Sequence, residues 1–108
     1  MSTHILDRLA HVIAARAEAG ADTSYTAKLL ASAPQLPARK LNEEATEVLI
    51  EALAGDTEKL AEESADLLYH LLVVWQAAGL RPQDVYAVLE RREGLSGLDE
   101  KASRPSED

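Results

Sequence analysis

Three properties of this 108-residue chain predict an all-α fold. Its most frequent residues are Ala and Leu, which are both strong helix formers. Apolar residues recur at intervals of three and four, and no segment shows the strict alternation of a half-buried strand. The length and a hydrophobic content of 46% suit one globular domain with a modest core. We therefore expect a helical hairpin bundle of about five helices.

The first two helices are expected over residues 5–19 and 25–32. The first is amphipathic and should end at Gly20, because glycine readily closes a helix. The second is short. Either Thr23 or Ser24 can cap its first turn, since a hydroxyl oxygen accepts a bond from a free backbone N–H.

The third helix is expected over residues 38–54, after Pro34 and Pro37 interrupt the chain. Gly55 should end this helix, because glycine adopts the left-handed conformation of a helix C-terminus without steric cost. The chain would then reverse direction and begin the next helix at once.

The fourth helix is expected over residues 57–78 and the fifth over residues 82–93. Asp56 can cap the fourth, and Gly79 should end it. Pro82 suits the first turn of the fifth helix, where a missing N–H is tolerated. Residues 1–93 would thus form one all-α domain, and the polar residues 94–108 a mobile C-terminal tail.

The fourth helix is apolar around nearly its whole circumference between Leu67 and Trp75. A helix of this kind must be covered on several sides. A homodimer that completes a four-helix-type bundle would supply the cover, and helices three and four would hold it together. The alternative is that the chain wraps this helix by itself.

Two acidic segments, residues 43–47 and 62–66, flank the predicted turn at equal distances. Residues equidistant from the turn face each other in an antiparallel hairpin. Glu44 would then face Asp66, and Glu47 would face Glu63. At about 100° per residue these carboxylates border the apolar stripe of each helix, whereas a solvated charged face normally lies opposite the core.

Facing carboxylates repel one another and raise each other's pKa. A hard divalent cation with oxygen ligands removes this cost, and Mg²⁺ commonly joins a few carboxylates to substrate phosphates. The sequence therefore predicts an Mg²⁺ site, which Mn²⁺ could also occupy. Its ligands would be Glu44, Glu47, Glu63 and Asp66. The alternative is that these acids are only solvated.

Charge and composition narrow the possible partners. A net charge of −8 argues against a nucleic-acid-binding surface. The chain has no Cys, which excludes disulfides, zinc–thiolate sites and thiol nucleophiles. The N-terminal residues lack the apolar segment of a secretory signal, and the longest apolar run is too short to cross a membrane. We expect a cytoplasmic protein.

The paired acidic motif resembles that of the MazG-like superfamily of all-α nucleotide pyrophosphohydrolases. Within it, further segments resemble the phosphoribosyl-ATP pyrophosphatases. These segments are SYTAKLL at residues 24–30, KLNEEATE at residues 40–47 and ADLLYHLL at residues 65–72.

The resemblance implies hydrolysis of phosphoribosyl-ATP to phosphoribosyl-AMP and pyrophosphate, the second step of histidine biosynthesis. Bound Mg²⁺ would acidify a water and neutralise the departing pyrophosphate. Glu43 or an incompletely engaged ligand such as Glu44 would accept the proton of the water. Lys28, Lys40 and His70 would contact the substrate, although each of the lysines could be an unengaged surface residue and His70 a hydrogen-bonded core residue.

Three other functions remain open at this point. A general (d)NTP pyrophosphohydrolase would share the acidic motif and differ in its preferred substrate. A di-iron carboxylate bundle would need Glu-x-x-His pairs, and that spacing is absent here. A non-catalytic helical dimer module would carry acids that are only solvated, and Mg²⁺ would not affect its stability.

Overall fold

Five helices form the computed structural model, which describes residues 4–19 and 24–93. They are α1 (Ile5–Ala17), α2 (Tyr25–Ala31), α3 (Gln35–Ala54), α4 (Thr57–Ala78) and α5 (Pro82–Arg92). The described residues contain no strand, so the all-α prediction is confirmed. Apart from the start of α3, the expected helix ends agree to about one or two residues. The predicted tail over residues 94–108 lies outside the described residues.

The start of α3 differs from the sequence-based prediction. The helix begins at Gln35, before Pro37 rather than after it. Pro37 occupies the first helical turn, where backbone N–H groups have no partner within the helix, so the missing N–H of proline removes no hydrogen bond. Its ring is also fully buried, and it therefore contributes to packing instead of interrupting the chain.

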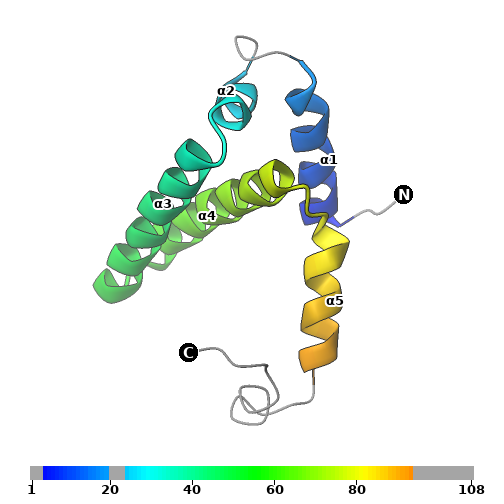
Figure 1. Ribbon diagram of the computed structural model, residues 1–108. Helices are drawn as coiled ribbons and strands as arrows, with labels where there is room; N and C mark the ends of the chain where they lie inside the picture. Colours follow the sequence, from blue (N-terminus) through cyan, green and yellow to red (C-terminus); the bar gives the residue numbers. More distant parts are fainter. Residues whose placement is uncertain (1–3, 20–23, 94–108) are drawn as a thin grey trace, which may run out of the picture.

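The hairpin of α3 and α4 forms as the sequence predicts, and the two helices lie side by side over most of their length (Figure 1). Gly55 has φ 75°, the left-handed conformation expected of a glycine that closes a helix. The Asp56 carboxylate accepts a hydrogen bond of 3.0 Å from the backbone N–H of Lys59 and so caps α4. These two residues set the hairpin turn.

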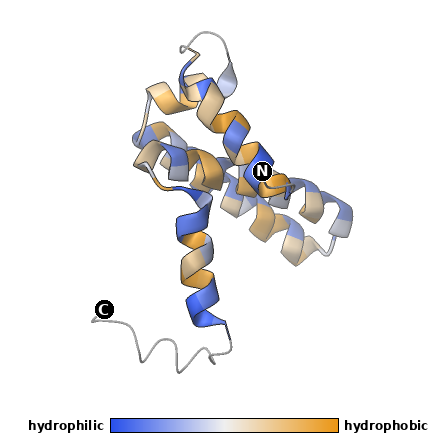
Figure 2. Ribbon diagram, turned by 90° about the vertical axis from the view of Figure 1, so that its right-hand side faces the viewer, coloured by the Kyte–Doolittle hydropathy of each residue, from blue (hydrophilic) through white to orange (hydrophobic). Residues whose placement is uncertain are grey.

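The core lies where α1 and α2 pack against the second half of α4. The buried side chains of this core are those of Ile13, Leu29, Leu72 and Val73. Hydrophobic and hydrophilic residues are interspersed along the helices, as amphipathic packing requires (Figure 2). The chain itself therefore covers much of α4, including the buried side chain of Leu72.

Helix α5 projects away from the α3–α4 hairpin and packs little against the other helices (Figure 1). The Tyr86 hydroxyl joins it to α1 by donating a hydrogen bond of 3.1 Å to the Asp7 carboxylate. In the part of the chain that is described, no helix combines the length and apolar character needed to cross a bilayer.

The hydrogen bond between Tyr86 and Asp7 should make the attachment of α5 sensitive to alkaline pH. Partial burial and the nearby Asp7 carboxylate raise the pKa of Tyr86 above its usual value. The stabilisation that this hydrogen bond gives is therefore complete below the pKa of tyrosine in the unfolded chain. It is lost as the pH rises through the pKa of Tyr86 in the folded protein. We expect Tyr86→Phe to lower the free energy of unfolding by about 1 kcal/mol at neutral pH. The difference between variant and wild type should disappear at alkaline pH in thermal melts, and a constant difference would contradict this account.

Candidate functional site

Carboxylates from α3 and α4 converge on one side of the hairpin. Glu44, Glu63 and Asp66 each offer an oxygen, and these oxygens lie within 4.8 Å of one another. Glu47 and Glu51 form a second group with Glu63 by the same criterion. We call these five residues the acidic cluster. All four residues predicted as metal ligands belong to it, and Glu51 is an addition that the sequence analysis did not assign.

Glu63 occupies the centre of the acidic cluster, because it is the residue that both groups share. Its pKa lies above the usual value for glutamate, first because its carboxyl group is partly desolvated and then because of the neighbouring negative charges. Those neighbours are Glu47, Asp66 and Glu44. Partial desolvation and the neighbouring like charges therefore disfavour the ionised form of Glu63.

Glu43 and Lys40 lie on α3 beside the acidic cluster, outside both carboxylate groups. The Lys40 ammonium is 3.3 Å from a Glu43 carboxylate oxygen, and the two side chains are 36% and 52% exposed. Exposed pairs of this kind contribute little to stability. Lys40 can therefore exchange Glu43 for a phosphate oxygen at small cost. The predicted substrate contact of Lys40 and the proton-accepting role of Glu43 stay predictions.

His70 lies one turn beyond Asp66 on α4 and is only 6% exposed. Its Nδ1 atom is 2.9 Å from the backbone carbonyl oxygen of Asp66, and its Nε2 atom is 3.4 Å from the Tyr25 hydroxyl. Because a carbonyl oxygen only accepts, Nδ1 carries the proton of the neutral ring, and Nε2 accepts from Tyr25. The predicted contact of His70 with substrate is untested, but both of its ring nitrogens already have partners.

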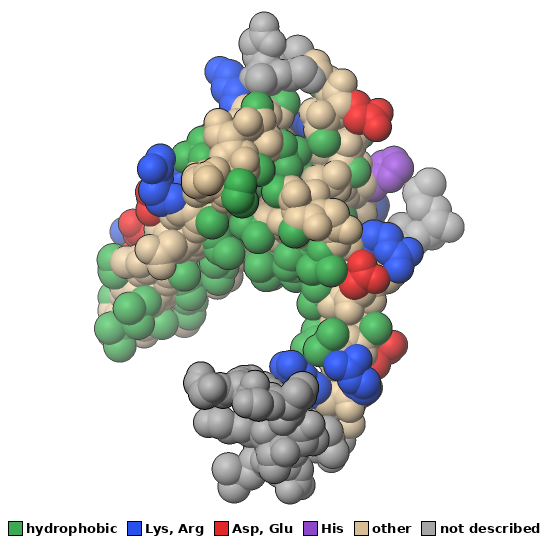
Figure 3. All heavy atoms as spheres, in the orientation of Figure 1, with side chains coloured by type: hydrophobic (Ala, Val, Ile, Leu, Met, Phe, Trp, Pro, Cys, Tyr) green, Lys and Arg blue, Asp and Glu red, His purple; other side chains and the backbone are tan. Residues whose placement is uncertain are grey.

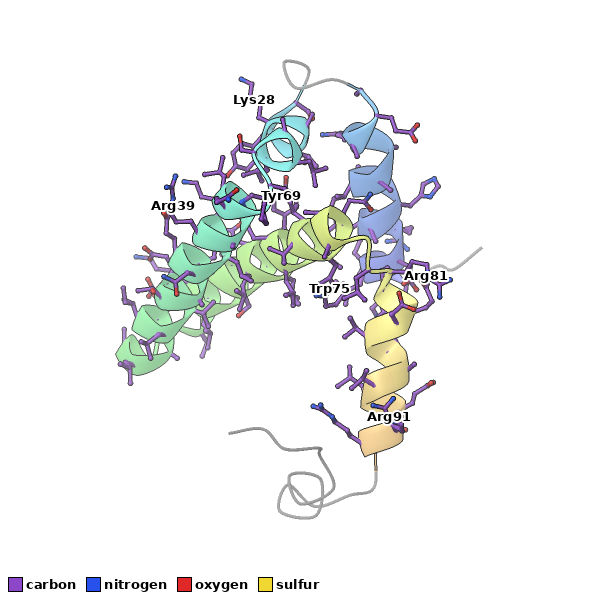
Figure 4. The ribbon with its side chains drawn as sticks, viewed as in Figure 1. Lys28, Arg39, Tyr69, Trp75, Arg81 and Arg91 are labelled. Atoms are coloured by element: carbon purple, nitrogen blue, oxygen red, sulfur yellow. The ribbon has the colours of Figure 1, made fainter. Side chains whose placement is uncertain are left out.

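Lys28, the remaining predicted substrate contact, lies on α2 and is exposed. Figure 4 shows its side chain extending outward from α2, whereas Tyr69 projects from α4 towards the junction of α2 and α3. The hydroxyls of Tyr69 and Thr26 form a hydrogen bond that joins α4 to α2. Lys28 is thus carried by a helix that is firmly held against α4.

Comparison with known proteins identifies the family. The family model described as phosphoribosyl-ATP pyrophosphohydrolase matches residues 6–93. The chain belongs to this family. A phosphoribosyl-ATP pyrophosphatase of Parvibaculum lavamentivorans is 60% identical over 99 residues, which cover 92% of this chain and 91% of the relative. The enzyme of the same name from Agrobacterium fabrum is 51% identical over 106 residues, which cover 98% and 99% of the two chains.

Membership of the phosphoribosyl-ATP pyrophosphohydrolase family confirms the resemblance found in the sequence. The matched range includes every helix that contributes to the acidic cluster. The sequence analysis gave Glu51 no role. It also gave no role to Tyr25, although this residue is the second of the SYTAKLL segment and follows the capping residue Ser24. The contact of Tyr25 with His70 spans 45 residues, and local spacing could not have indicated it.

Proposed function

We propose that this chain hydrolyses phosphoribosyl-ATP to phosphoribosyl-AMP and pyrophosphate, the second step of histidine biosynthesis, in a reaction that requires Mg²⁺ or Mn²⁺. The observation that carries the proposal is the acidic cluster, formed across one hairpin in a member of this family. A polyphosphate substrate and an acidic protein repel each other. Productive binding therefore requires a cation between them.

The residues of the acidic cluster fit a hard divalent cation. They offer only carboxylate oxygens, the chain has no Cys, and both nitrogens of the adjacent His70 are engaged. Oxygen-only sites suit Mg²⁺ and Mn²⁺ rather than zinc or copper. The ligands of one ion would be Glu44, Glu63 and Asp66, with Glu47 and Glu51 beside them. When bound, the ion supplies water activation and neutralises charge on the phosphates.

The remaining chemistry is assigned to residues on α3. Glu43 is exposed beside the acidic cluster, and it accepts the proton of the attacking water. Glu44 is the alternative acceptor, if it is not fully engaged as a ligand. Lys40 leaves Glu43 and binds a phosphate oxygen, so that the proton acceptor becomes available when substrate arrives.

The proposal includes a homodimer. Several large apolar side chains of the hairpin are exposed, among them Leu53 at 81%, Leu49 at 56% and Leu68 at 41%. Figure 3 shows hydrophobic side chains along the side of the molecule that is hollowed between the hairpin and α5. A second copy that packs on the hairpin would cover these leucines and build a four-helix-type bundle. It would also hold α3 and α4 in the register that the acidic cluster requires.

The deciding experiment measures pyrophosphate release from phosphoribosyl-ATP with Mg²⁺, with Mn²⁺ and with excess chelator. We expect turnover only with a metal ion. Release from dCTP or dUTP in preference to phosphoribosyl-ATP would contradict the substrate and favour a general nucleotide pyrophosphohydrolase. Full activity in chelator would contradict the metal requirement.

Metal binding should also be visible without substrate. At an Mg²⁺ concentration of roughly one hundred times its dissociation constant, binding to the native state adds about 2.7 kcal/mol to the free energy of unfolding. For a domain of this size the melting temperature should rise by on the order of 10 °C. A melt that is identical with Mg²⁺ and with chelator would instead indicate acids that are only solvated.

A further inference from the structure

Tyr25 is the one exposed aromatic residue of this chain. The protein has no Phe, and its other aromatic residues, Tyr69, Trp75 and Tyr86, are all at least half-buried. Tyr25 is 53% exposed. Figure 4 shows two of the others, Tyr69 and Trp75, on different sides of α4. Among the described residues, Tyr25 is therefore the aromatic side chain whose ring is accessible for stacking on a ligand that arrives from solvent.

The exposed ring is also fixed in place. Tyr25 stacks on Tyr69, with ring centroids 6.4 Å apart and planes inclined by 20°. Its hydroxyl donates to His70 Nε2, and the His70 ring in turn donates to the Asp66 carbonyl oxygen. An exposed tyrosine that points freely into solvent loses side-chain entropy when it binds a ligand. Tyr25 is pre-ordered by these contacts, so it loses less on binding.

Tyr25 contacts the same stripe of α4 that carries part of the acidic cluster. Glu63, Asp66 and His70 follow one another at helical spacing along one stripe of α4, and Tyr25 covers the His70 end of that stripe. One imidazole ring and two hydrogen bonds separate the Tyr25 hydroxyl from the backbone of Asp66. The exposed ring thus flanks the carboxylates on the side where α2 crosses α4.

We propose that the purine base of the substrate stacks on the ring of Tyr25 while its phosphates lie at the acidic cluster. This inference rests on the proposed function. It makes Tyr25 the residue that contacts the base, and it makes His70 a positioning residue that holds Tyr25. It also orients the nucleotide along the hairpin, with the base towards α2 and the phosphates towards Gly55. Stacking of a base on an aromatic ring is tolerant of base identity but requires an aromatic partner.

The first test compares Tyr25→Leu with Tyr25→Phe. We expect Tyr25→Leu to raise KM for phosphoribosyl-ATP about tenfold, with little change in kcat. Inhibition by inorganic tripolyphosphate, which has no base, should keep its wild-type strength. Tyr25→Phe retains the ring and should recover most of the lost affinity. The matched control is Val12→Ala on α1, where the side chain is 43% exposed.

Two results would overturn the inference while wild type still turns over phosphoribosyl-ATP. One is an unchanged KM in Tyr25→Leu. This result would overturn the inference even if the variant shifted the monomer–dimer equilibrium. The other is an equal loss of tripolyphosphate binding, which would show that Tyr25 merely supports the acidic cluster. Absence of turnover in wild type would instead contradict the proposed function.

A second measurement does not depend on whether Tyr25→Leu folds. Phosphoribosyl-AMP, the product of the proposed reaction, keeps the purine base and can be bound to the wild-type protein with Mg²⁺. We expect nuclear Overhauser effects between the purine protons and the ring protons of Tyr25. Effects to other side chains without any to Tyr25 would overturn the inference.

Discussion

Replacing Glu63 by Gln should abolish most of the turnover while making the metal-free protein more stable. Glu63 is shared by both carboxylate groups, so its loss removes a ligand from each. Loss of one preorganised electrostatic contact typically lowers kcat by about 10²–10³-fold, and we expect at least this effect. The amide has nearly the same shape but no charge. It therefore removes both the partial desolvation of a charged carboxylate and the repulsion from its neighbours, which together raise the pKa of Glu63.

The measurement combines pyrophosphate release with thermal melts in chelator and in Mg²⁺. Glu63→Gln should melt above wild type in chelator, and it should gain less from Mg²⁺ than wild type does. Glu47→Gln and Asp66→Asn each affect a single carboxylate group, yet we expect both to abolish turnover as well.

Glu58→Gln is the matched control, because Glu58 lies in the first turn of the same helix, is exposed and belongs to neither group. It should keep wild-type turnover. Equal losses in Glu58→Gln and Glu63→Gln would show that overall charge matters and that the acidic cluster has no specific role.

The hairpin could be predicted from the sequence because its signals are local. A glycine that closes one helix stands next to an aspartate that caps the next, and the length of the turn then fixes which residues face each other. The facing of Glu44 with Asp66 follows from that register alone. Helical spacing and one turn therefore suffice to predict the acidic cluster, except for the part played by Glu51.

Features that depend on distant contacts could not be predicted in this way. Pro37 looks like a helix breaker in sequence, but its buried position in the first turn of α3 reflects packing against other segments. Leu72 looks like an interface residue because α4 is apolar all round. Only the path of α1 and α2 across α4 shows that this leucine belongs to the core of the chain. The partnership of Tyr25 with His70 has the same origin.

Replacing Leu68 by Lys should dissociate the proposed homodimer without unfolding the chain. Leu68 is 41% exposed on α4, whereas Leu72, one turn later, is 4% exposed. Burial of one leucine contributes roughly 1.5–3 kcal/mol, and a two-fold symmetric interface buries two copies. We therefore expect the dissociation constant to rise at least about a hundredfold. Leu72→Lys should instead unfold the chain, because the charge would enter its core.

Sedimentation equilibrium at micromolar concentrations, together with circular dichroism, separates these outcomes. Val12→Lys is the matched control, because Val12 on α1 is 43% exposed and lies outside the hairpin. It should remain a dimer. Activity should fall with dissociation in Leu68→Lys, because the monomer loses the proposed cover of its exposed hairpin leucines, and this cover helps to hold the acidic cluster in register. A fully active wild-type monomer would contradict the homodimer, and the exposed leucines Leu49, Leu53 and Leu68 would then need a different cover.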